Sequence, residues 1–152
     1  MNRRDAIQLT PEEQTQFLEQ TRTIVLSTLD RRGYPHSVGM WYVMDDGCCL
    51  MTTYGKSQKV RNIERNPKVG LLAESGATYD TLKGVLIRGR AQLIHDVDAC
   101  VQVLGRIHQK MTGSFPAGIE EALRQQARKR VLVKVIPERI SSWDHSKLGG
   151  TY

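Results

Sequence analysis

Residues 21–54 read TRTIVLSTLDRRGYPHSVGMWYVMDDGCCLMTTY, and this stretch decides the fold class. Three segments rich in β-branched and aromatic residues, 21–30, 34–44 and 48–54, favour β-strands. The residues between them, Asp30–Gly33 and Asp45–Gly47, are typical turn sequences, and Asp-Gly is a strong hairpin signal. Three consecutive strands joined by tight turns predict an antiparallel meander, so a parallel Rossmann sheet is disfavoured.

The chain on either side of this meander predicts short helices and further strands. Thr10-Pro11-Glu12-Glu13 is a capping box that begins a helix from Pro11 to about Gln20. Further helices are expected over 57–66, after Asp96 and over 119–130, and further strands over 68–74, 84–95 and 130–143. Gly84 and Gly89 predict a bend or bulge, and Pro137 bends the last strand or places it at an edge. The result is one α+β domain over residues 1–152, an antiparallel barrel with short flanking helices.

Composition excludes several classes of protein. With 39% hydrophobic and 25% charged residues, the chain is expected to fold. No run approaches the roughly 20 apolar residues of a membrane span, and the first residues lack a signal peptide, so a cytoplasmic location is expected. The adjacent Cys48 and Cys49 form neither a disulfide framework nor a metal-binding pair, so no metal site is expected. The net charge of +6 favours anionic partners, but scattered basic residues and 6% aromatic content argue against nucleic acid.

Residues 52–61, TTYGKSQKVR, are the best candidate for chemistry. They lead from a strand end through Gly55 into a predicted helix, and a helix N-terminus with nearby cations and hydroxyls favours a phosphate group. A P-loop would need a glycine where Leu50 stands, so the segment does not match the phosphate-binding motif of a nucleoside triphosphatase. The alternative interpretation is a solvated basic turn that only caps the helix.

Three motifs, in this order, carry a family resemblance: KSQK at 56–59, TYDTL at 78–82 and SWDH at 142–145. With NPKVGLL at 66–72, they resemble the pyridoxamine 5′-phosphate oxidase-like split β-barrel superfamily, from about Leu9 to Leu148. More narrowly, the chain is similar to the flavin/deazaflavin-dependent oxidoreductases. It lacks the Arg-rich flavin signature and C-terminal Arg motif of true pyridoxamine phosphate oxidases.

The resemblance implies a homodimer that holds its cofactor in a cleft between the subunits. It implies that the segment from Lys56 to Arg61 binds the cofactor phosphate, and that strand residues 37–41 run beside the ring, where Gly39 allows a close approach. A bulge role for Gly39 and core packing of Trp41 stay open. The implied cofactor-binding residues are Val38, Gly39, Met40, Trp41, Thr52, Thr53, Lys56, Ser57, Lys59, Val60, Arg61, Tyr79 and Trp143.

The implied activity is hydride transfer between the bound cofactor and a small organic redox substrate. Coenzyme F-420 (8-hydroxy-5-deazaflavin), whose anionic oligoglutamate tail suits a basic groove, is the first choice, and FMN is the second. No side chain is nominated as an essential catalyst; His145 is either a proton donor or a surface residue, and His36 is expected to be structural. The alternative is a non-enzymatic flavin, deazaflavin or haem binding or sensor protein, since a fold does not fix a function.

Overall fold

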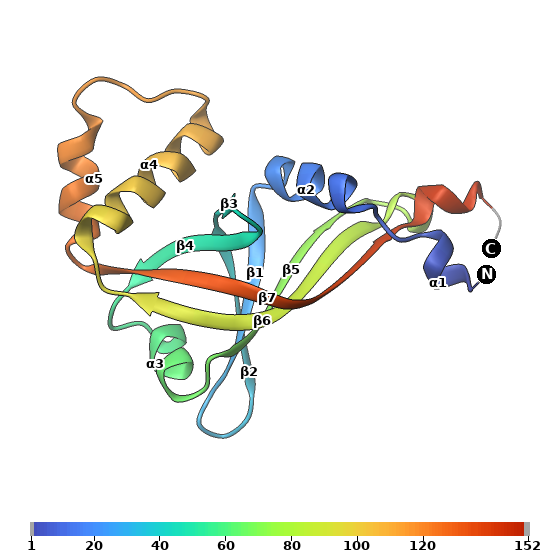
Figure 1. Cartoon of the computed structure of the whole chain (residues 1–152), viewed down its shortest axis with the longest axis horizontal. Helices are drawn as coiled ribbons and strands as arrows, with labels where there is room; N and C mark the ends of the chain where they lie inside the picture. Colours follow the sequence, from blue (N-terminus) through green and yellow to red (C-terminus); the bar gives the residue numbers. More distant parts are fainter. Residues whose placement is uncertain (1, 151–152) are drawn as a thin grey trace.

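Seven strands form one antiparallel sheet in the computed structural model, which describes residues 2–150 (Figure 1). In chain order they are β1 (Thr23–Leu29), β2 (Pro35–Trp41), β3 (Val43–Asp45), β4 (Cys48–Tyr54), β5 (Lys68–Ser75), β6 (Lys83–Ile94) and β7 (Arg130–Asp144). Their order in the curled sheet is β2-β1-β5-β6-β7-β4-β3. The predicted α+β split barrel is confirmed.

Short helices flank the sheet, and the sequence predicts the four α-helices that begin after residue 10 but not the first one. They are α1 (Arg3–Ala6), α2 (Pro11–Gln20), α3 (Gln58–Arg65), α4 (Val97–Thr112) and α5 (Ile119–Ala127), with the 3-10 turns η1 (Tyr79–Thr81) and η2 (His145–Leu148). The capping box of α2 is present: the Glu13 N–H donates to Thr10 Oγ1 at 3.2 Å, and the Thr10 N–H donates to Glu13 Oε2 at 2.8 Å. Asp96 caps α4 by accepting a hydrogen bond from the Ala99 N–H at 3.0 Å.

The predicted meander is wrong in its middle strand. Residues 34–44 do not form one strand, because the chain leaves the ladder at Tyr42, and β2 and β3 lie at opposite edges of the sheet. Tyr42 is fully buried and its hydroxyl donates to the Leu18 carbonyl at 2.6 Å. Its side chain therefore holds the chain where it passes from one edge to the other. As a result, β4 pairs with β7 and β3, and never with β2.

The bend predicted in the long strands occurs at Gly89. The β6–β7 register shifts between Arg88 and Gly89, and Gly89 pairs with Pro137. A Cβ at Gly89 would lie 2.3 Å from the Ile136 carbonyl oxygen, so a side chain would not fit there. At Gly84 the register is regular, and the missing side chain makes room for the indole of Trp143 instead. Pro137 lies just beyond the β4–β7 ladder, which ends at Cys49↔Val135, so from Pro137 onward β7 is paired with β6 alone, as the sequence predicts for a proline at a bend or edge.

Two buried clusters stabilise the two faces of the sheet. The barrel interior is filled by Ile24, Leu26, Met51, Leu71 and Val133 with their neighbours. On the opposite face, the α4–α5 hairpin packs over Leu50 and Leu132 (Figure 1). None of the helices within residues 2–150 has the length and apolarity needed to cross a membrane.

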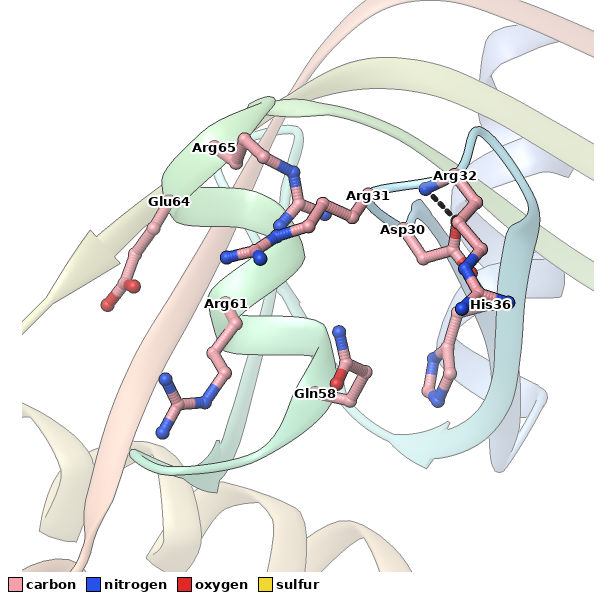
Figure 2. Close-up of a pocket in the computed structure, with 8 residues that line it drawn as sticks. All are labelled: Asp30, Arg31, Arg32, His36, Gln58, Arg61, Glu64 and Arg65. Carbon is pink, nitrogen blue, oxygen red and sulfur yellow. Dashed lines mark hydrogen bonds between the residues drawn. The ribbon is translucent and has the colours of Figure 1, made fainter.

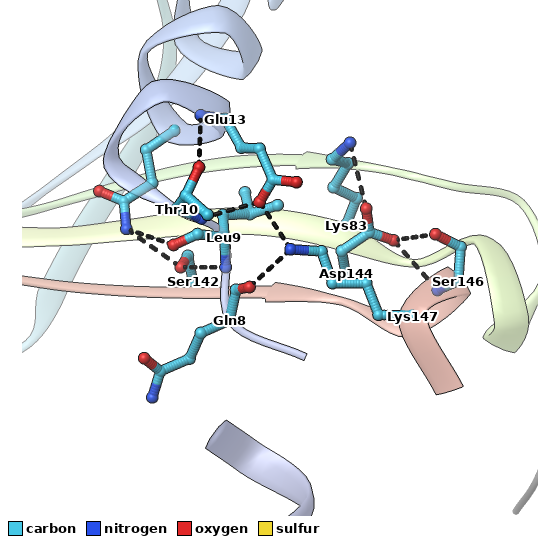
Figure 3. A network of polar contacts seen from close by, with 10 residues as sticks. Gln8, Leu9, Thr10, Glu13, Lys83, Ser142, Asp144, Ser146 and Lys147 are labelled. Atoms are coloured by element: carbon cyan, nitrogen blue, oxygen red, sulfur yellow. Dashed lines mark hydrogen bonds and ion pairs between the residues drawn. The ribbon is translucent and has the colours of Figure 1, made fainter. Parts of the chain in front are cut away.

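A polar network joins the two ends of the chain (Figure 3). Lys147 Nζ donates to the Gln8 carbonyl at 2.8 Å and to Glu13 Oε2 at 2.6 Å. Nearby, Lys83 forms a 3.2 Å ion pair with Asp144. Burial alone would raise the pKa of Asp144, but hydrogen bonds from Ser146 and the ion pair outweigh it, so the pKa is lowered.

Candidate functional site

The barrel is split between β2 and β4. The β3–β4 ladder ends at Val43↔Leu50, and continuing its register would place Trp41 opposite Thr52. Trp41 instead pairs with Thr23 of β1, so β2 and β4 diverge from this point. The divergence leaves an opening beside Trp41 and Thr52.

Ser57 lies three residues after the end of β4, directly before the first residue of α3. It occupies the N-cap position of α3, yet its side chain makes no capping hydrogen bond. Its Oγ is buried and has no hydrogen-bond partner within residues 2–150. Buried hydroxyls are almost always hydrogen-bonded, so an orphaned one points to a missing ligand. The first N–H groups of the helix also lack intrahelical acceptors.

Lys59 and Arg130 bring two positive charges to the same corner. Arg130 Nη1 donates to the Thr52 carbonyl at 3.3 Å and to Thr52 Oγ1 at 3.4 Å. Burial lowers the pKa of Lys59, and the neighbouring charge of Arg130 lowers it further. Across the described chain, neither cation forms an ion pair with a carboxylate. Two uncompensated cations beside an orphaned hydroxyl and a helix N-terminus fit a phosphate group. We call Thr52, Ser57, Lys59 and Arg130 the phosphate corner.

Arg130 was not among the residues predicted from the sequence. It is the first residue of the last strand, and only the pairing of β7 with β4, which puts it opposite Tyr54, brings it to the corner. Nothing near it in the sequence signals this position.

Arg61 lies on the other side of α3, where it lines a basic cavity of about 780 Å³ (Figure 2). Helix α3 and the β1–β2 hairpin supply its walls, which are lined by Asp30, Arg31, Arg32, His36, Gln58, Arg61, Glu64 and Arg65. Its four guanidinium groups form no ion pair with a carboxylate anywhere in residues 2–150. His36 lines this cavity, and its Nδ1 is buried without a hydrogen-bond partner in the described chain.

A second cavity, of about 320 Å³, opens where β2 and β4 diverge. It is lined by Met40, Trp41, Thr52, Leu104, Ile107, His108, Met111, Leu123, Gln126 and Arg130. Its lining is mostly apolar, and Thr52 and Arg130 belong to both the cavity and the phosphate corner. The two sites are therefore adjacent.

The other predicted residues of β2 and β4 flank the opening with different orientations. Val38 and Met40 face the barrel side of β2, whereas Gly39 and Trp41 alternate to the outer side, and Trp41 is 58% exposed. A Cβ at Gly39 would lie only 3.1 Å from Thr23 Cγ2. Thr53 and Val60 are buried, and Lys56 is exposed in the turn after β4.

Tyr79 and Trp143 lie far from the phosphate corner. Arg130 and Trp143 are at opposite ends of the 15-residue strand β7, which at about 3.3 Å per residue spans roughly 40 Å between them. Tyr79 lies near the end of β7 that holds Trp143. The Tyr79 carbonyl oxygen is 2.8 Å from His145 Nδ1, and the centres of the Tyr79 and His145 rings are 4.6 Å apart in an edge contact. One subunit therefore does not bring all the predicted residues to one place.

Known structures share this architecture. A conserved hypothetical protein from Mycobacterium tuberculosis is 36% identical, with all of this chain and 95% of that one covered and a TM-score of 0.92. An F-420 reductase shares the fold at 24% identity, with 87% of this chain and 98% of that one covered and a TM-score of 0.67. HutZ, a haem storage protein from Vibrio cholerae, shares it at 19% identity, with 92% of this chain and 99% of that one covered and a TM-score of 0.69. Among curated proteins, no sequence match is found.

The family model described as pyridoxamine 5′-phosphate oxidase matches residues 10–144, which include the split, the phosphate corner and the Trp143 end of β7. This match spans most of the chain. The protein is therefore a member of the pyridoxamine 5′-phosphate oxidase family.

Proposed function

We propose that the protein is an oxidoreductase that binds a flavin-type cofactor in the split between β2 and β4. Coenzyme F-420 is the first choice and FMN the second. The observation that carries this proposal is the phosphate corner, where a buried Ser57 hydroxyl without a partner meets the uncompensated charges of Lys59 and Arg130. Both cofactors carry a phosphate that these groups suit.

The chain's own residues would bind and orient the cofactor. Ser57, Lys59 and Arg130 would hold the phosphate, with Thr52 fixing the guanidinium of Arg130. Because β2 is an edge strand with β1 as its one neighbour, the backbone of Val38–Trp41 offers free N–H and C=O groups to a ring edge. When bound, the cofactor ring supplies the hydride-transfer chemistry, and the protein contributes position and electrostatics.

The basic cavity supports F-420 over FMN. It lies across α3 from the phosphate corner, and its arginines suit the oligoglutamate tail that F-420 carries and FMN lacks. Replacing Arg31 and Arg61 together by Gln should therefore weaken F-420 binding and leave FMN binding within twofold. Equal effects on the two cofactors would contradict the choice of F-420.

The distance between the two groups of predicted residues supports a homodimer. Tyr79 and Trp143 contribute to a cofactor site only if a second subunit brings its own far end of β7 to the corner. Light scattering at micromolar protein should give twice the mass of the 17.2 kDa chain. A monomer would contradict this part of the proposal.

Cofactor titration of the purified protein tests the proposal. Lys59→Ala should weaken binding of the native cofactor by roughly tenfold or more, because a charge-assisted hydrogen bond is worth about 1.5–3 kcal/mol. The matched control is Lys129→Ala, which removes the same charge from the exposed residue beside Arg130. Equal affinities for wild type and Lys59→Ala would remove the corner from the site. Turnover of reduced cofactor with organic acceptors separates an enzyme from a binding protein.

A further inference from the structure

The smaller cavity has the character of a ligand site. Its volume of about 320 Å³ is at the small end of the roughly 300–1,000 Å³ of pockets that take small organic ligands. Met40, Leu104, Met111 and Leu123 give it an apolar lining, and the two methionines can adapt to several shapes. None of the described residues that line it is acidic.

The roof of the cavity is a stripe along α4. Leu104, Ile107, His108 and Met111 follow the spacing of one helix face. Leu104, His108 and Met111 are only half-buried, whereas Val103 and Ile107 are buried. The stripe therefore borders a space that the protein itself does not fill.

Two long side chains hold this roof in place. Arg106 donates to the Met44 carbonyl at 2.8 Å and pairs with Asp45 at 3.3 Å. Lys110 Nζ donates to the carbonyls of Leu18 and Tyr42, each at 3.3 Å, and lies 3.8 Å from the centre of the Tyr42 ring. Because α4 is fixed to β3 and to the Tyr42 crossing, the cavity is preformed.

We propose that this cavity binds the organic substrate: a small, mainly apolar ring compound with one anionic or carbonyl oxygen. The apolar lining would take the ring. Arg130, which uses Nη1 on Thr52, retains further N–H donors for the oxygen, and His108 offers another polar contact at the rim. Since Arg130 also borders the phosphate corner, the ligand would lie next to the cofactor. The assignment rests on the proposed function, because only a bound cofactor makes this ligand a substrate.

Calorimetric titration with 2-naphthoate, an aromatic ring with one carboxylate, tests the assignment on the intact protein without cofactor. We expect saturable binding of one naphthoate per chain. Leu104→Trp should weaken it at least tenfold by filling the cavity, and Met111→Trp at its rim is a second variant if the first fails to fold. Gln102→Trp, on the exposed side of the same helix, is the matched control and should bind like wild type. No binding to wild type, or equal binding to the Leu104 and Met111 variants, would overturn the assignment.

A second titration separates this inference from the proposed function. Naphthoate should bind the protein saturated with F-420 at least as well as the free protein, giving a ternary complex. Displacement of naphthoate by F-420 would mean that the cavity belongs to the cofactor, and would overturn the assignment while the proposed function stands. Naphthoate binding with neither F-420 nor FMN binding would show that the proposed function fails, and the substrate role with it.

Discussion

Ser57→Ala should stabilise the cofactor-free protein, although N-cap serines ordinarily stabilise helices. A working N-cap loses about 1 kcal/mol when it is replaced by Ala. Ser57 makes no capping hydrogen bond, so this loss does not apply. Its buried, unpartnered hydroxyl instead carries a desolvation cost of about 1–3 kcal/mol, which the alanine removes. The expected net gain is about 1 kcal/mol, or roughly 2–4 °C in the midpoint of thermal unfolding for a domain of this size.

Thermal unfolding followed by circular dichroism measures the change, and Thr10→Ala is the matched control. Thr10 caps α2 with both hydrogen bonds of the capping box in place, so its replacement should lower the midpoint by a similar amount. The same Ser57→Ala variant should bind F-420 about tenfold more weakly, because a hydrogen bond to the charged phosphate is lost. If Ser57→Ala lowers the unfolding midpoint as Thr10→Ala does, Ser57 is an ordinary cap and the reasoning fails.

Other properties of the chain can be checked in the same preparations. Because the pKa of Asp144 is lowered in the folded state, its contribution to stability is complete above the unfolded pKa of about 4 and is lost as the pH falls through the folded pKa. Asp144→Asn should therefore reduce the loss of unfolding free energy as the pH falls below about 4. The same loss in the variant and in the wild type would contradict the stabilising role of Asp144. Gly84→Ala should cost about 1–3 kcal/mol in urea unfolding, because its Cβ would lie 2.4 Å from the Trp143 ring; a neutral result would contradict that packing. Burial raises the pKa of Cys49 to about 12, so iodoacetamide should not alkylate Cys49 in the folded protein at pH 8. Alkylation of Cys49 as fast in the folded protein as in urea would contradict this burial.

Local signals predicted the local elements well. The capping box at Thr10, the Asp96 cap and the burial of Val60 and Ile63 on one face of α3 all depend on residues within a few positions of one another. Gly89 was predicted to interrupt a strand, and the structure places a register shift there. These features are confirmed because short-range sterics and hydrogen bonds decide them.

Long-range pairing could not be read in the same way. Residues 34–44 have the composition of one strand, and only the burial of Tyr42 against Leu18 shows that the chain crosses from one edge of the sheet to the other there. The same crossing creates the split, and the β4–β7 pairing brings Arg130 to the phosphate corner. The predicted residues Thr52 and Lys59 do lie near Arg130, and Ser57 lies two residues before Lys59 at the start of α3. Their role in binding stays a prediction.

A crystal structure of the protein with bound F-420 tests the central claim most directly. The account predicts a phosphate oxygen about 2.5–3.0 Å from Ser57 Oγ, with Lys59 and Arg130 as the charged partners. It also predicts that the Ser57 hydroxyl no longer lacks a hydrogen bond. A phosphate bound elsewhere, with Ser57 still unpartnered, would contradict the account.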